Sequence, residues 1–146
     1  MSDASERAVS IERTGPEHFV VTNVRGGTLA IGSGNDDDFT PIELLLSAIG
    51  TCSASDVDLI TSRRAEPTLF SVTVRGDKIR DPEAGNRLVN LEVVFAVTFP
   101  AGPEGDRARN ALPRAVKMSH DRLCTVSRTV EHGTPIATRL TTAGET

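Results

Sequence analysis

The first forty residues alternate between short β-type segments and polar turns. Arg7–Arg13 alternates weakly, Glu17–Val24 has a β-rich centre, and Thr28–Ile31 follows the turn Arg25-Gly26-Gly27. Period-two patterns separated by Gly-rich turns are typical of antiparallel strands. The sequence therefore predicts an N-terminal meander of three strands, preceded by a loose tail over residues 1–6.

A polar loop over residues 32–38 follows the meander and contains three aspartates. Adjacent carboxylates can hold a metal ion, but no later acidic residue completes the spacing of a calcium-binding loop. The loop is interpreted as a solvated turn, and no metal site is predicted.

A long helix is predicted from Thr40 onward. Thr40 is a suitable N-cap, Pro41 suits the first helical position, and Glu43 completes a capping box. The helix should end near Arg63-Arg64, before Pro67. Its apolar stripe is formed by residues 45, 49, 52, 59 and 60. Further apolar residues lie on its other faces, which is typical of a helix buried in the fold or at a subunit interface.

The rest of the chain predicts a hairpin, two helices and a final strand. In chain order these are the strand Leu69–Val74, a loop over Gly76–Asn86, the strand Leu88–Phe99, the amphipathic helix Pro103–Met118, a short helix around His120–Thr129 and the strand Thr134–Leu140. Pro113 should kink or break its helix, and Gly133 should stop the short helix. This order of elements indicates an α+β fold rather than a doubly wound sheet.

Composition narrows the class of protein. The 146 residues fit one domain, 1–146. A formal net charge of -4 and an aromatic content of 3% are not those of a nucleic-acid-binding surface. The acidic N-terminus does not resemble a secretory signal, and no uninterrupted apolar run reaches about 18 residues. We therefore expect a cytoplasmic protein with no nucleic-acid or membrane partner.

The two cysteines are the candidate reactive groups. Cys52 lies about three turns beyond the start of its helix, too far for the helix dipole to lower the pKa of its thiol. Asp56, four residues later, would disfavour a thiolate there. Activation of Cys52 would need a cation brought by tertiary or quaternary contact, such as an arginine. The residues alone leave open whether Cys52 is reactive or a small buried hydrophobe.

Cys124 lies near the start of the short helix, with Ser119 as a candidate N-cap and His120 four residues before it. A helix N-terminus and a protonated histidine would both favour a thiolate. A packed core cysteine is the alternative. The three histidines are scattered and the chain has no CxxC motif, so neither a metal centre nor a Cys–His hydrolase is indicated.

Two segments resemble the OsmC/Ohr family, the osmotically induced protein C and organic hydroperoxide resistance proteins. The first is Pro41-Ile42-Glu43-Leu44-Leu45-Leu46-Ser47-Ala48-Ile49-Gly50-Thr51-Cys52, and the second is Leu123-Cys124-Thr125-Val126-Ser127. The resemblance implies an intertwined α+β homodimer with antiparallel sheets around a long central helix. The order is three strands, a helix, two strands, two helices and a strand.

The resemblance also implies a reaction. Cys52 would be the peroxidatic thiolate that reduces an organic hydroperoxide and becomes a sulfenic acid, and Cys124 would condense with it to a disulfide. No bound cofactor is implied. An external dithiol, such as a lipoyl group, would reset the pair.

One departure from the family motif concerns activation of Cys52. Ile42 stands where the best-known branches have a catalytic glutamate. Glu43 is one residue later, on the opposite side of the helix from Cys52. It is interpreted as the capping-box residue, and activation of Cys52 is the alternative role for it. Arg13 and Arg25 are candidates for the family's activating arginine. The alternative function is an OsmC-like dimer that binds a small ligand or serves in stress with little or no peroxidase activity.

Overall fold

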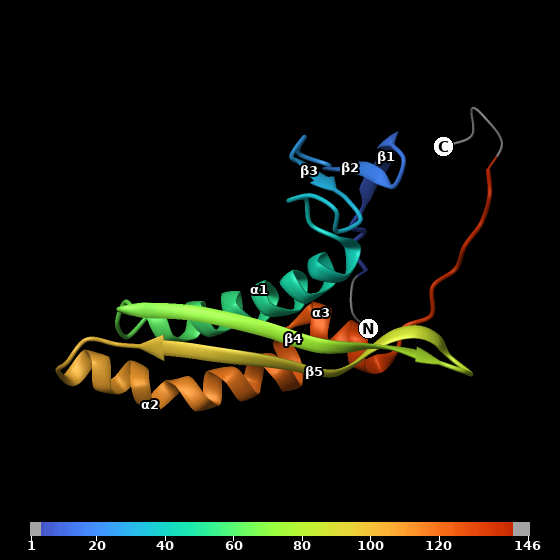
Figure 1. Ribbon diagram of the computed structural model, residues 1–146. Helices are drawn as coiled ribbons and strands as arrows, with labels where there is room; N and C mark the ends of the chain where they lie inside the picture. Colours follow the sequence, from blue (N-terminus) through green and yellow to red (C-terminus); the bar gives the residue numbers. More distant parts are fainter. Residues whose placement is uncertain (1–3, 142–146) are drawn as a thin grey trace. The chain divides into compact units, whose positions relative to one another are not determined.

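A computed structural model describes residues 4–141, which form two compact units, residues 4–47 and residues 48–141 (Figure 1). The long helix α1 (Pro41–Ser62) begins in the first unit and continues into the second. The two units are described separately below. The expected tail over residues 1–6 lies partly outside the described residues, and the single domain 1–146 stays a prediction.

The first unit contains the predicted meander. Strands β1 (Val9–Gly15), β2 (His18–Asn23) and β3 (Thr28–Ile31) form one antiparallel sheet in that order. The turn between β2 and β3 is held by the side chain of Asn23, whose Oδ1 accepts hydrogen bonds from the N–H groups of Arg25 and Gly27 at 2.9 and 3.1 Å. The turn residues seen in the sequence therefore set this register.

The predicted start of α1 is confirmed. Thr40 N–H donates to Glu43 Oε1 at 2.9 Å and Glu43 N–H donates to Thr40 Oγ1 at 3.2 Å, a complete capping box. The buried positions differ from the predicted stripe, since Leu45 and Leu59 are exposed in this chain. The positions that are buried are Ile49, Gly50, Ser53, Val57 and Thr61. Two polar residues thus occupy the side of the helix that packs inside the second unit.

By length and composition alone, α1 could cross a membrane, with a mean hydropathy of 1.3 over its most apolar window. A core helix of a soluble domain passes the same test. Ser53 is buried and hydrogen-bonded to Ser119 of a neighbouring element, and the buried hydroxyl of Thr61 donates to the Val57 carbonyl of α1 itself, so both hydroxyls have partners.

A long hairpin carries the second unit. Strands β4 (Leu69–Asp81) and β5 (Gly85–Thr98) pair along their length, so the loop expected over Gly76–Asn86 is wrong. Gly76 lies at a bulge, and pairing resumes at Asp77. The turn is confined to the tip, where Asp81 Oδ1 accepts the N–H groups of Glu83 and Ala84. Gly, Pro and Asp in this stretch mark a bulge and a tight turn rather than one loop.

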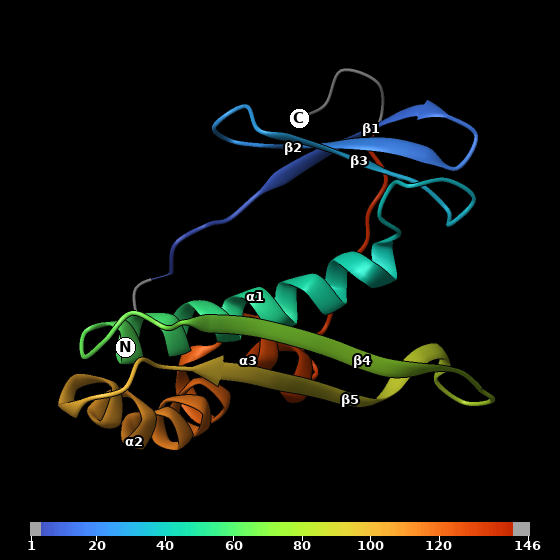
Figure 2. The ribbon, with the colours of Figure 1, turned by 60° about the vertical axis from the view of Figure 1, so that its left-hand side comes forward.

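Helices cover one face of this hairpin, as both ribbon views show (Figures 1 and 2). Gly50 of α1 lies against β4 so closely that a Cβ there would stand 2.5 Å from Val74 Cγ2. Helix α2 (Pro103–Met118) begins at Pro103 and continues through Pro113, so the break that we allowed for at Pro113 is not seen.

The short helix expected around His120–Thr129 is two elements. A π-helical turn, η1 (Ser119–Leu123), continues directly from α2, and the chain is extended at Cys124 before α3 (Thr125–His132) begins. Ser119 is therefore not an N-cap, and Cys124 caps α3 instead. The expected stop is confirmed, because Gly133 adopts the left-handed conformation with φ 64°.

The final strand expected over Thr134–Leu140 is wrong for this chain. Residues 134–141 form no regular element, and Ile136 and Leu140 are 91% and 98% exposed. A strand needs a partner for its backbone hydrogen bonds, and none pairs with this segment among residues 4–141. The alternating pattern alone could not supply one.

Candidate functional site

The structure brings the two cysteines together. Cys52 lies on α1 beside the buried positions Ile49 and Ser53 and is partly buried, whereas Cys124 is fully buried at the start of α3. Cys124 is close enough to affect the pKa of the Cys52 thiol through hydrogen bonding. Both thiols are free. Residues 72 positions apart in sequence thus form one site in the second unit.

Burial and three neighbouring groups act on the Cys52 thiol, and their net effect is to raise its pKa. Burial is the largest cause, because desolvation penalises the thiolate. The backbone N–H of Val126 opposes it by hydrogen bonding, while Cys124 and the charge of Asp56 raise the pKa further. The expected effect of Asp56 is confirmed. Among residues 4–141, none of the groups that shift the pKa of this thiol is a cation.

Cys124 is held by the first turn of α3. Its Sγ accepts the N–H of Ser127 at 3.4 Å, and its S–H donates to Ser127 Oγ at 3.2 Å. Val126, one residue earlier, directs its N–H at Cys52. Two successive N–H groups at the start of α3 therefore donate hydrogen bonds to the two sulfur atoms. They are available because α3 begins after the extended residue Cys124, and the first N–H groups of a helix have no partner within the helix.

A chain of buried hydroxyl groups lies beside the thiols, and no sequence motif indicated it. Ser119 is fully buried, and its Oγ donates to Asp56 Oδ2 at 2.8 Å. Since a hydroxyl has one proton, Ser53 must donate the 3.0 Å bond that joins it to Ser119 Oγ. The only sequence signal was a serine, Ser53, next to Cys52 in a strongly apolar helix.

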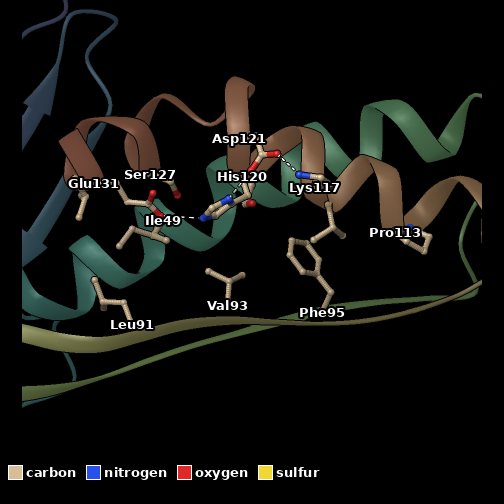
Figure 3. A pocket seen from close by; sticks show the side chains of 13 residues that line it. Ile49, Leu91, Val93, Phe95, Pro113, Lys117, His120, Asp121, Ser127 and Glu131 are labelled. Carbon is tan, nitrogen blue, oxygen red and sulfur yellow. Dashed lines mark hydrogen bonds and ion pairs between the residues drawn. The ribbon is translucent and has the colours of Figure 1, made fainter.

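A pocket of about 550 Å³ opens between the hairpin and the helices of the second unit (Figure 3). One side is the apolar face of β5, with Leu91, Val93 and Phe95, and Ile49 of α1 lies opposite (Figure 3). Ser127, the hydrogen-bond partner of Cys124, belongs to its lining. An apolar pocket with a few polar groups is the usual form of a small-molecule site.

The polar rim of this pocket is a chain of ion pairs. Both ring nitrogens of His120 lie 2.9 Å from carboxylate oxygens, Nδ1 from Asp121 and Nε2 from Glu131, and the protonated ring can donate both hydrogen bonds (Figure 3). These two carboxylates raise the pKa of His120. Lys117 and His120 in turn lower the pKa of Asp121 to about 2. The rim thereby ties η1 to α2 and α3.

The other three predicted site residues lie in the first unit. The carboxyl of Glu43 accepts the Thr40 N–H, and the hydrogen bonds to Thr40 lower its pKa, as expected of a capping-box residue. Arg13 is exposed on β1, and Arg25 is exposed in the turn after β2. Neither arginine makes an ion pair with a described residue, and activation of Cys52 by either stays a prediction.

One cluster in the first unit has the composition of a metal site. His18, Asp36 and Asp38 place their ligand atoms within 4.8 Å of one another. His18 Nε2 is bonded to Asp36 Oδ2 at 2.6 Å and Nδ1 to the carbonyl of Pro16 at 2.8 Å. Asp36 raises the pKa of His18, so the pair is accounted for as a surface ion pair.

Comparison with known proteins identifies the family. Residues 34–139 match the family model described as OsmC-like protein. The chain belongs to the OsmC-like family. This match includes both cysteines, the helix that carries Cys52 and the hairpin. Uncharacterized proteins of Mycobacterium tuberculosis and Mycobacterium bovis are each 31% identical over 128 residues, which cover 86% of this chain and 90% of theirs.

Solved structures of this OsmC-like fold match most of the chain. A hypothetical protein from Aquifex aeolicus has a TM-score of 0.71 at 22% identity, covering 90% of this chain and 91% of its own. An OsmC-like protein from Mycoplasma pneumoniae has a TM-score of 0.67 at 11% identity, with 87% and 88% covered. An organic hydroperoxide resistance protein OsmC from Legionella pneumophila has a TM-score of 0.60 at 15% identity, with 88% and 91% covered. These likenesses confirm the α+β OsmC/Ohr fold.

Proposed function

We propose that this protein is a cysteine-dependent peroxidase that reduces organic hydroperoxides, with Cys52 as the peroxidatic residue and Cys124 as the resolving residue. The observation that carries the proposal is the pairing of a partly exposed thiol with a fully buried one in a member of this family. The exposed partner can meet a peroxide, and the buried partner can meet only the product formed on Cys52.

The proposed reaction balances with these two residues and an external dithiol. The Cys52 thiolate attacks the O–O bond of ROOH, takes the terminal oxygen as Cys52–SOH and releases RO⁻, which is protonated to the alcohol. Cys124–SH then attacks the sulfenic sulfur, forming the disulfide and releasing water. A dithiol, such as a lipoyl group, supplies the two electrons and two protons that restore both thiols.

The pocket supports an organic rather than a small inorganic peroxide. Its lining is mainly apolar, and Ser127 and Ser53 connect it to the two cysteine-bearing turns. A volume of about 550 Å³ suits an alkyl or aryl group. The substituent of ROOH would lie against β5 while its peroxide group reaches Cys52.

Activation of Cys52 requires a group beyond those that act on it in the single chain, because burial and Asp56 raise the pKa of its thiol. A homodimer would supply a second copy of every arginine, Arg13 and Arg25 included. Exposed apolar residues of α1, such as Leu45 and Leu59, give such a dimer an apolar surface to bury. The proposal therefore includes a homodimer, and the expected cytoplasmic location stays a prediction.

A second candidate function is ligand binding without peroxide chemistry. It is favoured by the raised pKa of Cys52 together with a pocket that neither cysteine lines directly. A fluorescent apolar probe would then bind equally well to the wild type and to Cys52→Ser, and peroxide would leave the thiols reduced.

Intact-mass spectrometry of the reduced protein tests the first proposal. One equivalent of cumene hydroperoxide should remove about two mass units from the wild type, because one disulfide replaces two thiols. Cys124→Ser should instead gain about 16 mass units, with the added oxygen on Cys52. Cys52→Ser should not react. The proposal fails if the wild-type thiols remain reduced after an hour at stoichiometric peroxide.

A further inference from the structure

We infer that Ser119 is a positioning residue that holds Cys124 in register with Cys52 through Asp56, and that disulfide closure depends on it. The role given to Ser119 in disulfide closure rests on the proposed peroxidase function. Its evidence is a separate set of contacts around a fully buried hydroxyl group.

Ser119 is connected to both cysteine-bearing elements. Its hydroxyl donates to Asp56 Oδ2 at 2.8 Å and accepts from Ser53 Oγ at 3.0 Å, two bonds to α1. Its carbonyl accepts the N–H of Cys124 at 2.9 Å, the hydrogen bond that closes the π-helical turn. One residue therefore links α1 to the backbone of Cys124.

The points of attachment on α1 lie next to Cys52. Ser53 follows Cys52 directly, and Asp56 is one helical turn further on. A shift of η1 along α1 would break both bonds and leave a buried hydroxyl without partners, which is costly. These bonds therefore hold the backbone of Cys124 at a fixed position relative to Cys52.

The π-helical turn places Cys124 where its sulfur can approach Cys52. A π-turn inserts an extra residue into the helical path and is often found at functional sites. Here the turn ends at Cys124, where the chain becomes extended with φ −72° and ψ 99°. The extended residue turns its sulfur toward Ser127 and Cys52 instead of continuing the helix surface.

Asp56 consequently has two separable effects. As a hydrogen-bond acceptor it anchors Ser119, and as a charge it raises the pKa of the Cys52 thiol. An amide oxygen can still accept from a hydroxyl but carries no charge. Asp56→Asn should keep the anchor, whereas Asp56→Ala removes it.

The step that depends on Ser119 is condensation, in which Cys124–SH attacks Cys52–SOH to give the disulfide and water. In Ser119→Ala and in Asp56→Ala, closure should be about tenfold slower, the effect of losing a buried hydrogen bond to a charged group. Asp56→Asn should close within about twofold of the wild type. Ser55→Ala is the control, because Ser55 is an exposed serine of the same helix whose hydroxyl donates to the Thr51 carbonyl of that helix.

The experiment follows oxidation of each reduced variant by one equivalent of cumene hydroperoxide, with dimedone present to trap Cys52–SOH. The expected result is more trapped adduct in Ser119→Ala and Asp56→Ala. Peroxide consumption should stay normal in Ser119→Ala, whereas both Asp56 variants lose the charge that raises the pKa of Cys52 and should consume peroxide at least as fast as the wild type. The inference is overturned if both alanine variants close the disulfide as fast as the wild type. It is also overturned if Asp56→Asn is as slow as Asp56→Ala.

A second oxidant separates this inference from the proposed function. Diamide takes two electrons and two protons from a pair of thiols and forms the disulfide without any peroxide. If the wild type ignores cumene hydroperoxide, the peroxidase proposal fails, yet diamide still reports the closure rate. Far-UV circular dichroism checks folding, and if Ser119→Ala is unfolded, the comparison of Asp56→Asn with Asp56→Ala decides alone.

Discussion

At the scale of single residues, the chemistry of Cys52 depends on a balance among its neighbours. Burial and the carboxylate of Asp56 disfavour the thiolate, while the N–H of Val126 favours it. A thiol with a raised pKa is mostly protonated at neutral pH, and the thiolate is the nucleophile. The peroxide reactivity of an isolated chain should therefore increase as the pH rises through this raised pKa.

Asp56→Asn should lower the pKa of Cys52, because it removes a nearby negative charge. The measurement is thiolate absorbance at 240 nm against pH in a Cys124→Ser background, which leaves one titrating thiol. Asp58→Asn is the matched control, since Asp58 is exposed on the same helix and does not act on Cys52. An unchanged titration in Asp56→Asn would contradict this account of the charge.

At the scale of elements, the ion pairs of His120 join η1 to α3. The pKa of His120 is raised by Asp121 and Glu131, so folding favours the protonated ring. The stability that His120 adds is fully present below about pH 6.5, the ordinary pKa of a histidine in the unfolded chain. It is lost as the pH rises through the raised pKa of the folded state.

His120→Gln should therefore destabilise the protein at pH 5.5 and have little effect at pH 9. Urea unfolding of both proteins at the two pH values measures this, and the difference between variant and wild type removes the contribution of other groups such as His18. Asp121, with a pKa of about 2, stays ionised throughout. A larger effect of the substitution at pH 9 than at pH 5.5 would disprove the linkage.

The packing of α1 on β4 depends on a glycine. A Cβ at position 50 would stand 2.5 Å from Val74 Cγ2, so Gly50→Ala forces the Val74 side chain or the two elements to shift. We expect a net destabilisation of about 1–2 kcal/mol, since overpacking outweighs the gain in helix propensity. Thermal or urea unfolding measures the change. Adding Val74→Ala should cost less in the Gly50→Ala background than in the wild type, and simple additivity would refute the contact.

The features of the fold that were predicted correctly depend on residues close together in the sequence. The capping box at Thr40 and Glu43 and the left-handed Gly133 depend only on residues a few positions apart, and both were found where expected. The loop over Gly76–Asn86 was wrong because a glycine in a bulge looks like a glycine in a turn. Only cross-strand pairing, which is not local, distinguishes the two.

The candidate site was predicted in part. Cys52 and Cys124 could be chosen because their two segments resemble the cysteine motifs of the family, and the charge effect of Asp56 could be predicted from helix geometry. The contact of Ser119 with Asp56 could not be predicted, because the two residues lie 63 positions apart. The π-helical turn that begins at Ser119 also has no recognisable sequence signature. The final strand failed for a similar reason, since a strand is defined by its partner.

At the scale of the whole molecule, exposed apolar side chains bear on the proposed homodimer. Ile136 and Leu140 are almost fully exposed in a segment without regular structure, and Leu59 is 59% exposed on α1. The proposed homodimer would bury such side chains in an apolar interface.

In solution the protein should have twice the chain mass of 15.5 kDa. Size-exclusion chromatography with light scattering measures this. A double substitution, Ile136→Asp with Leu140→Asp, should raise the dimer dissociation constant at least about tenfold, because it places charge where apolar surface would be buried. Arg139→Asp, between them, is the control. A monomeric wild type would contradict the proposed assembly.

The unequal burial of the two thiols determines which of them is oxidised irreversibly first. Cys124 has no exposed surface, so oxidants in the solvent reach Cys52 first. Sulfinic and sulfonic acids, the irreversible products, should thus accumulate on Cys52 while Cys124 is spared. Protein isolated from stressed cells would then carry a record of its past exposure at a single position, readable as the oxidation state of one peptide.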